Sequence, residues 1–280
     1  MQIDFYCPRW GSEQIGWPQF GAQVKQEGFV GVEVFPLGDK PNNTDMVKVL
    51  GDAGLSYILL HAELQEGKDF NRYIHALERN LYALLEYQNQ DAKPEFIVTQ
   101  TGREYYSREQ MEACFAICDR ISRESSIKII QETHRNKWSF AAHVVKDYLM
   151  EFPSLELALD FSHWVCVSES YLEDQEEAVK LAIRHGRHLH ARVGFLEGPQ
   201  VTDPRAPENE EALKHHLAWW DQWITHLTEI GADRATITPE FGPYPYMQYR
   251  PFTKQTLASQ WEINCWMRQM LNERYQTHTG

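Results

Sequence analysis

Four short apolar runs between residues 127 and 240 end in, or carry, a side chain that can bind a metal ion. These side chains are Glu132, Asp160, His190 and Glu240. Three carboxylates that converge with an imidazole would repel one another strongly if left unpaired, and a divalent cation removes that cost. The mixed oxygen and nitrogen set suits manganese, magnesium, cobalt, iron or zinc, without choosing among them. The sequence therefore predicts one divalent metal ion, provided that the fold brings the four residues together.

The elements that must position these residues are strands alternating with helices. Apolar or β-branched runs typical of strands occur at about eight places, and the segments between them have helical periodicity. The clearest helices are expected at 70–90 and at 107–121, where SREQ has the form of a capping box. The predicted strands are IDFY, FVGVEVF, LSYILLH, EFIVTQ, IKIIQE, LELALD, HLHARV and ATITPE.

Eight strands alternating with helices in 280 residues predict an α/β fold, a closed (β/α)8 TIM barrel that forms a single domain over residues 1–280. An open doubly wound sheet is the second choice, because no glycine-rich phosphate motif follows the first strand. Several helices are expected to end at a glycine, as αβ connections usually do. These glycines are Gly28, Gly54, Gly186 and Gly231.

Alternation of side chains along the strands predicts which residues point into the barrel. In LELALD the leucines take the face toward the helices, which leaves Asp160 on the inner face. His190 shares the inner face of its strand with His188 and Arg192, and Glu240 shares that of the last strand with Thr236 and Thr238. Since the chemistry of such barrels lies at the carboxyl ends of the strands, the four predicted ligands should meet at one mouth.

Other residues near strand ends are candidates for substrate contact. His163 and Trp164 follow Asp160, His61 ends the third predicted strand, and His134 follows Glu132. Glu33 points inward on the second strand, where it could bind a substrate hydroxyl or brace a loop. The long polar connection 194–209 is expected to cover the site, since loops of this length in compact domains are often functional.

Composition excludes several classes of partner. The formal net charge of −13 argues against a nucleic-acid backbone as the main partner. No uninterrupted apolar stretch reaches the roughly 18 residues of a membrane helix, and the first ten residues do not resemble a signal peptide. We therefore expect a cytoplasmic protein that binds neither nucleic acid nor membrane. Five scattered cysteines indicate reduced thiols. Tryptophan-rich segments near the C-terminus could cover a homo-oligomer interface or pack in the core.

The chain resembles the xylose isomerase-like TIM barrel superfamily of sugar isomerases and epimerases over essentially its whole length. Ketose 3-epimerases, hydroxypyruvate isomerase and inosose dehydratase are members. The resemblance implies that Glu132, Asp160, His190 and Glu240 hold one divalent ion, and that His163 contacts substrate oxygens. Arg192, where a lysine is frequent, suits polarising a substrate oxygen or binding a carboxylate. HARVG departs from the His-x-Gly-Glu of the epimerases and the His-x-Lys-Asp of dehydratase-like members. The matching motifs are GFVGVEVF, QETHR, DFSH, HLHAR and TPEFG.

The predicted function is a divalent-metal-dependent isomerase or epimerase that acts on a small sugar or keto-sugar derivative. Glu132 and Glu240 are the candidate acid and base on the two faces of the substrate, and the cation stabilises a cis-enediolate. One alternative is a metal-dependent lyase or dehydratase acting on a keto-polyol, in which the same intermediate loses a β-hydroxyl. Another is a non-catalytic barrel that binds sugars through aromatic residues near the strand ends.

Overall fold

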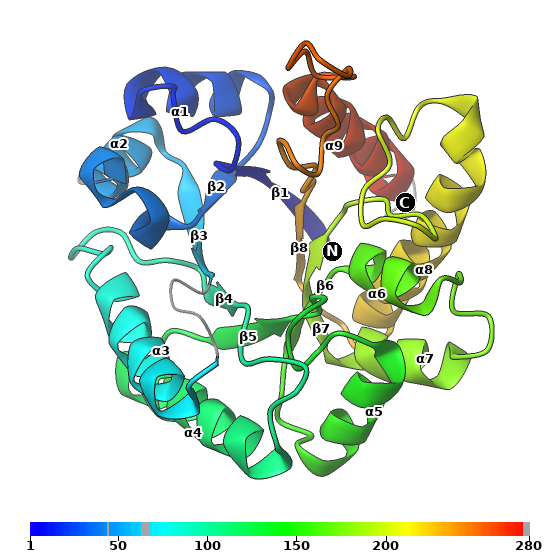
Figure 1. Ribbon diagram of the computed structural model, residues 1–280. Helices are drawn as coiled ribbons and strands as arrows, with labels where there is room; N and C mark the ends of the chain where they lie inside the picture. The colour runs from blue at the N-terminus through cyan, green and yellow to red at the C-terminus, as the bar shows by residue number, and fades with distance from the viewer. Residues whose placement is uncertain (44, 63–67, 277–280) are drawn as a thin grey trace.

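Eight parallel strands close into a barrel in the order of the chain, each strand bonded to the next and β8 bonded to β1 (Figure 1). The computed structural model describes residues 1–43, 45–62 and 68–276. The predicted closed (β/α)8 TIM barrel is confirmed. The strands are β1 (Gln2–Pro8), β2 (Gly31–Val34), β3 (Ser56–His61), β4 (Ile97–Thr99), β5 (Ile129–Glu132), β6 (Leu157–Leu159), β7 (Gly186–His190) and β8 (Arg234–Thr238).

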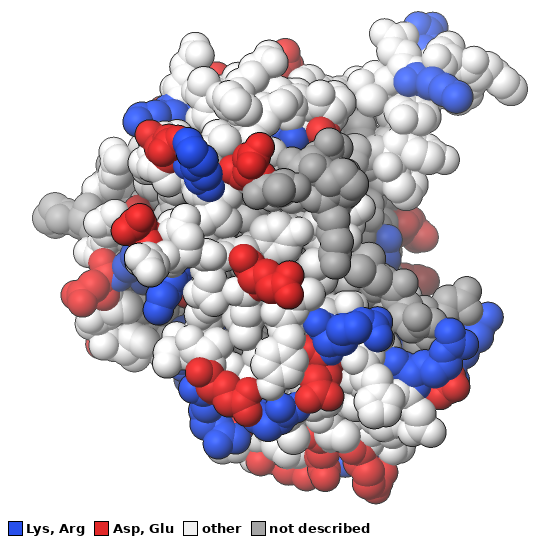
Figure 2. Space-filling view, turned by 90° about the vertical axis from the view of Figure 1, so that its left-hand side faces the viewer, with Lys and Arg blue, Asp and Glu red and all other residues white. Residues whose placement is uncertain are grey.

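Helices form a ring around the barrel, and α9 returns to lie next to β1 (Figure 1). None of the helices within the described residues is long and apolar enough to span a membrane. On the face that Figure 2 shows, basic side chains are interspersed with acidic ones. The helices are α1 (Trp17–Gln26), η1 (Pro36–Asn43), α2 (Met46–Ala53), α3 (Phe70–Leu84), α4 (Arg108–Ser125), α5 (Ala142–Glu151), α6 (Phe161–Ser168), α7 (Glu176–His185), η2 (Pro207–Asn209), α8 (Glu210–Glu229) and α9 (Gln260–Gln276).

The hydrophobic core has two parts, and the side-chain alternation of the strands separates them. Leu157 and Leu159 belong to the large cluster between the strands and the helices, whereas Ala158 belongs to a small cluster inside the barrel. Tyr6, Ile58, Val98 and Ile130 complete that inner cluster. The predicted orientation of the leucines in LELALD is therefore confirmed, and Asp160 follows on the inner side.

The helix ends match the sequence signals in most places. Ser107 caps α4 with the predicted capping box, and Gly28, Gly54 and Gly231 have φ of 77°, 68° and 69°, which only glycine adopts easily. Gly186 is the C-cap of α7, as expected, but its φ of −69° is not left-handed, and the same residue begins β7. A Cβ there would lie 2.4 Å from Leu159 Cδ1, so close packing requires this glycine.

Two predicted boundaries also move. Helix α3 ends at Leu84, six residues before the expected end. The seventh strand ends at His190, so Arg192 lies beyond the ladder, although its side chain is buried.

Candidate metal centre

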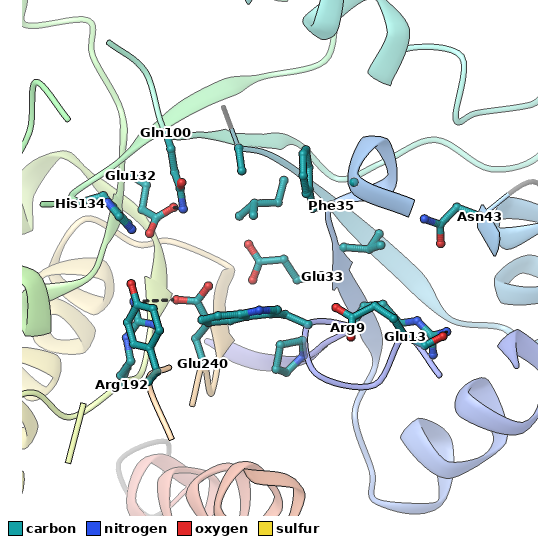
Figure 3. Close-up of a pocket in the computed structure, with 17 residues that line it drawn as sticks. Arg9, Glu13, Glu33, Phe35, Asn43, Gln100, Glu132, His134, Arg192 and Glu240 are labelled. Carbon is teal, nitrogen blue, oxygen red and sulfur yellow. Dashed lines mark hydrogen bonds and ion pairs between the residues drawn. The ribbon is translucent and has the colours of Figure 1, made fainter. Parts of the chain in front are cut away.

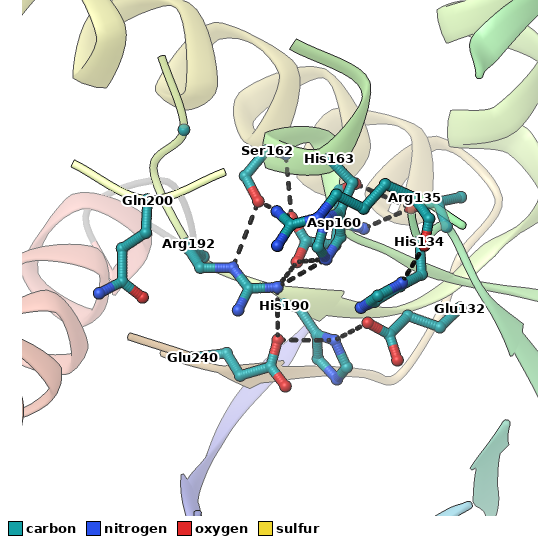
Figure 4. A network of polar contacts seen from close by, with 12 residues as sticks. Glu132, His134, Arg135, Asp160, Ser162, His163, His190, Arg192, Gln200 and Glu240 are labelled. Atoms are coloured by element: carbon teal, nitrogen blue, oxygen red, sulfur yellow. Dashed lines mark hydrogen bonds and ion pairs between the residues drawn. The ribbon is translucent and has the colours of Figure 1, made fainter. Parts of the chain in front are cut away.

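The four predicted ligands converge at the carboxyl ends of β5 to β8 (Figure 4). Glu132 is the last residue of β5, Asp160 directly follows β6, His190 ends β7, and Glu240 lies two residues beyond β8. Each offers one ligand atom, and these four atoms all lie within 4.8 Å of one another. All four residues are buried. The short strands thus place three carboxylates and an imidazole in one small volume.

Three of the converging atoms have no hydrogen-bond partner among the described residues. They are Glu132 Oε1, His190 Nδ1 and Glu240 Oε2, and each is buried. His190 Nδ1 lies 3.7 Å from Glu132 Oε1 and 3.2 Å from Glu240 Oε2. Buried polar atoms without partners each cost about 1–3 kcal/mol, so their convergence calls for a ligand. Two carboxylate oxygens and an imidazole nitrogen are suitable donors for a divalent cation, and the residues present fit such an ion.

Two further groups of potential ligands share residues with this one, and each adds one buried atom without a hydrogen-bond partner, Glu33 Oε2 in one and His163 Nδ1 in the other. Each of these groups therefore has two such atoms among the described residues, against three in the first group. In the group Glu33, His188 and His190, His188 bonds Thr236 Oγ1 at 2.8 Å and Thr238 Oγ1 at 3.1 Å. The third group consists of Glu132, His134 and His163. Its two histidines already bond the Arg135 carbonyl and Arg192, respectively. The group around His190 Nδ1 therefore fits a cation best.

Glu33 holds His190 from the side opposite the unpartnered Nδ1. Its Oε1 lies 2.9 Å from His190 Nε2, and both side chains are buried. When Nε2 carries the hydrogen and donates it to Glu33, the lone pair of Nδ1 faces Glu132 and Glu240. The sequence interpretation assigned Glu33 to a substrate hydroxyl or a loop, because its strand is far from those of the four predicted ligands in strand order. In a closed barrel, inward side chains from such strands meet across the lumen.

Neighbouring polar groups fix two of the carboxylates. Gln100, which follows β4, donates from Nε2 to Glu132 Oε2 at 3.0 Å. Asp160 is the N-cap of α6, and its Oδ1 accepts from Ser162 N at 2.9 Å and from Ser162 Oγ at 2.5 Å. The sequence interpretation missed Gln100, although its position after a strand end was a usable signal. Because these bonds engage Glu132 Oε2 and Asp160 Oδ1, the other carboxylate oxygens, Glu132 Oε1 and Asp160 Oδ2, point toward the site.

Arg192 reaches the same site from beyond β7. Its Nη2 contacts Asp160 Oδ2, lies 3.3 Å from Glu240 Oε2, and donates to His163 Nε2 at 2.9 Å (Figure 4). Its guanidinium carbon lies 4.7 Å from the centre of the Tyr246 ring. Arg192 is therefore a cation that neutralises part of the acidic cluster.

The ionisable groups of the site influence one another strongly. Burial raises the pKa of Glu132 above its ordinary value. Burial also opposes the charged form of Glu240, but His190 and Arg192 outweigh it and lower the pKa of this carboxyl. Burial would lower the pKa of His190, yet Glu240 and Glu33 together hold it well above its usual range. Opposed shifts of this kind are typical of functional sites.

A cavity of about 380 Å³ opens beside the cluster (Figure 3). Glu132 and Glu240 line it, as do three of the residues predicted to contact substrate: Glu33, His134 and Arg192. Trp10 and Tyr246 also line it, with ring centres 5.1 Å apart. The cavity thus combines carboxylates, an arginine, an imidazole and two aromatic rings. A small polar molecule of sugar size can contact all of these groups.

The other predicted contact residues lie outside the lining. His163 is buried behind it, with its ring centre 3.9 Å from that of His134. His61 is buried and bonds Thr99 Oγ1 at 2.9 Å. Trp164 belongs to the hydrophobic core, and its indole N–H donates to the Ser139 carbonyl.

The connection 194–209 does not cover the site as expected. Within the described residues it contributes nothing to the cavity lining. Instead, Gln200 exchanges two hydrogen bonds with the backbone of Gly242, at 3.2 and 2.8 Å. It thereby braces the connection between β8 and α9, which carries Tyr246 into the cavity.

Comparison with known proteins gives a clear result for the fold. The structure is similar to the probable 3-DHS dehydratase AsbF of Bacillus anthracis, with a TM-score of 0.60, 16% sequence identity, and coverage of 97% of this chain and 99% of that chain. It is also similar to a xylose isomerase-like TIM barrel protein from Mycobacterium smegmatis in complex with magnesium (TM-score 0.59, 10% identity, coverage of 96% and 97%). The chain has the xylose isomerase-like TIM barrel fold.

A third solved structure with the xylose isomerase-like fold is the 3-keto-D-glucoside 4-epimerase YcjR of E. coli. It has a TM-score of 0.59 and 10% identity, and the alignment covers 96% of this chain and all of the epimerase chain. No protein-family model matches the sequence, and no curated protein matches it significantly. At these identities the similarity establishes the fold, and the chemistry depends on the residues of the site itself.

Proposed function

We propose that the protein is a divalent-metal-dependent isomerase or epimerase of a sugar or keto-sugar derivative. The observation that carries this proposal is the convergence of three buried ligand atoms, on Glu132, His190 and Glu240, that have no hydrogen-bond partner among the described residues and lie beside a cavity of about 380 Å³. The similar solved structures include an epimerase, a dehydratase and a magnesium complex, which supports metal-assisted chemistry on a small polar substrate.

Glu132, Asp160, His190 and Glu240 would hold the ion. A divalent ion bound there supplies Lewis acidity, which polarises a carbonyl oxygen and makes the neighbouring carbon-bound proton easier to remove. The donor set does not distinguish magnesium, manganese, cobalt, iron and zinc. The identity of the metal is therefore left to the metal content of the purified protein.

Glu132 and Glu240 are the proposed acid and base. They come from β5 and from the end of β8, line the same cavity, and flank His190 Nδ1. One carboxylate would take the proton from the carbon next to the carbonyl, and the other would return a proton to the neighbouring carbon or to the opposite face of the same carbon. The first outcome is an isomerisation, in which the proton of the neighbouring hydroxyl also passes to the former carbonyl oxygen, and the second is an epimerisation.

Four of the other lining residues would bind and orient the substrate. Trp10 and Tyr246 offer ring faces and edges to the carbon skeleton, while His134 and Arg192 offer polar contacts to its oxygens. His163 would act through Arg192, because its Nε2 accepts a hydrogen bond from Arg192 Nη2. His61 and Trp164 lie outside the cavity, so we assign them a structural role.

A lyase is the second candidate, and the similarity to a probable dehydratase favours it over a purely binding role. In a dehydration, the same abstraction of a proton next to the carbonyl is followed by loss of a β-hydroxyl. The two reactions differ in product, because only the lyase releases water and forms a product 18 mass units lighter.

The test is a screen for solvent deuterium incorporation over ketoses and keto-polyols, using the metal-loaded protein and mass spectrometry. We expect deuterium at the carbon next to the carbonyl of the true substrate, and no exchange in Glu240→Gln. Metal content is measured in parallel, and the variant should retain part of its metal through the three other ligands. Glu13→Gln, which changes a carboxylate of the same cavity, is the matched control and should exchange normally. Exchange at the wild-type rate in Glu240→Gln would overturn the assignment, and bound metal without exchange on any sugar would favour a binding protein.

A further inference from the structure

Arg192 occupies an unusual position for a residue that is expected only to contact substrate. We propose that Arg192 is an internal cation that competes with the divalent metal ion for Asp160 and Glu240, and so limits how tightly the protein holds that ion. The proposal depends on the proposed function at one point, namely that the site binds a divalent cation. It goes beyond it by giving Arg192 a role in metal affinity.

The geometry places the guanidinium among the predicted ligands. Arg192 Nη2 contacts Asp160 Oδ2 and lies 3.3 Å from Glu240 Oε2, one of the buried oxygens that has no hydrogen-bond partner. The side chain is 2% exposed, so water does not screen these charges. A single nitrogen atom thus faces two of the three carboxylates that would bind the cation.

Other groups hold Arg192 in this position. Its Nε donates to Ser162 Oγ at 3.3 Å, its Nη2 also donates to His163 Nε2, and the Tyr246 ring lies against the guanidinium. A positive charge fixed next to Asp160 and Glu240 repels a divalent ion bound to the same carboxylates. Metal binding must therefore either displace Nη2 from these oxygens or overcome the repulsion.

A supporting role would be the ordinary explanation, in which Arg192 orients Asp160 for the metal. The contacts of Asp160 argue against it. Its Oδ1 is already fixed by Ser162 N at 2.9 Å and by Ser162 Oγ, as the N-cap of α6. Because these bonds do not involve Arg192, removing the guanidinium should leave the carboxylate in place and free its second oxygen. Support and competition therefore predict opposite changes in metal affinity.

The experiment measures Mn²⁺ binding to the metal-free protein at pH 7.5, by titration calorimetry with chelator competition. We expect Arg192→Met to bind Mn²⁺ at least tenfold more tightly than the wild type, which corresponds to about 1.4 kcal/mol. Arg192→Lys keeps the positive charge but replaces the guanidinium with a single ammonium group, and should bind Mn²⁺ with an intermediate affinity. Arg135→Met is the matched control. It removes a cation that lies 5.0 Å from the same Tyr246 ring but forms no ion pair with the three carboxylates among the described residues, so it should change the affinity less than twofold.

Thermal unfolding with and without Mn²⁺ provides an independent readout. Without metal, Arg192→Met removes the guanidinium from beside the buried carboxylates of Asp160 and Glu240, and should unfold at a lower temperature than the wild type. Saturating Mn²⁺ should raise its unfolding temperature by more than it raises that of the wild type. Should Arg192→Met be too unstable to purify, Arg192→Lys carries the test with the same sign.

The outcomes separate the two proposals. Unchanged or weaker Mn²⁺ binding in Arg192→Met, with normal binding by the wild type, would overturn competition and leave the proposed metal-dependent function intact. Equal gains in Arg192→Met and Arg135→Met would also overturn it, because they would point to a general charge effect. Absence of Mn²⁺ binding in the wild type and in every variant would overturn both proposals.

Discussion

The contact between Glu33 and His190 leads to a sharp prediction about metal affinity. Glu33 Oε1 lies 2.9 Å from His190 Nε2, and His190 Nδ1, on the other side of the ring, is one of the unpartnered atoms. Replacing Glu33 with alanine removes the acceptor that fixes which nitrogen carries the hydrogen. The neutral imidazole can then carry its hydrogen on Nε2 or on Nδ1. Only the tautomer with the hydrogen on Nε2 leaves a lone pair on Nδ1 for the metal.

The expected loss of Mn²⁺ affinity follows from the strength of one buried, charge-assisted hydrogen bond. Such a bond contributes about 1.5–3 kcal/mol. At about 1.4 kcal/mol for each factor of ten, Glu33→Ala should weaken Mn²⁺ binding by about 10- to 100-fold. Glu33→Gln keeps an oxygen acceptor but loses the charge, and should weaken it by about tenfold or less.

The assay is Mn²⁺ titration with chelator competition, together with nitrogen-15 NMR of histidine side chains in the metal-free protein. Glu13 lines the same cavity, but its carboxylate accepts a hydrogen bond from the backbone N–H of Gly11. Glu13→Gln should therefore change the Mn²⁺ affinity less than twofold. Wild-type Mn²⁺ affinity in Glu33→Ala would refute the positioning role of Glu33. An equal loss in Glu13→Gln would refute it as well, because the effect would then reflect only the charge of the cavity.

Two further predictions concern pH. Although His190 is buried, Glu240 and Glu33 hold its pKa well above the usual range, so the imidazole must lose a proton before Nδ1 can bind metal. The affinity for Mn²⁺ should therefore rise by about tenfold per pH unit while His190 remains protonated. Chelator competition between pH 6 and 8 measures this rise. Burial lowers the pKa of His216 from 6.5 to about 4, so its contribution to stability is complete above pH 6.5 and is lost as the pH falls toward 4. By linkage this loss is about 2 kcal/mol at pH 5, and the difference in urea unfolding free energy between pH 7 and 5 should be smaller by about that amount in His216→Gln.

The sequence predicted the barrel and the meeting of the four candidate ligands because both follow from local rules. A period of two along each strand decides which side chains face the lumen, and parallel strands bring their carboxyl ends to one mouth. These two rules are enough to bring Glu132, Asp160, His190 and Glu240 together. Neither requires knowledge of loop conformation.

The residues that were missed or misplaced depend on contacts between distant parts of the chain. The connection 194–209 was expected to cover the site, but its Gln200 instead braces the connection between β8 and α9. Trp164 resembles a cavity aromatic in the sequence, yet α6 turns it into the core. Gly186 is the helix C-cap that its spacing indicates, but the requirement for glycine there comes from the packing of Leu159. Periodicity along the chain contains no information about such contacts.

Asp160 shows why a weak motif can be ambiguous and informative at once. A carboxylate at the end of an apolar strand can serve as a helix N-cap or as a metal ligand. In the structure one residue satisfies the geometry of both. Oδ1 caps α6 through Ser162, and Oδ2 faces Arg192 and the converging ligand atoms. Since the cap fixes the carboxylate through one oxygen, the other is held in position for a cation, whether that cation is a guanidinium or a metal ion. The structural role of Asp160 is therefore what makes it suitable as a ligand.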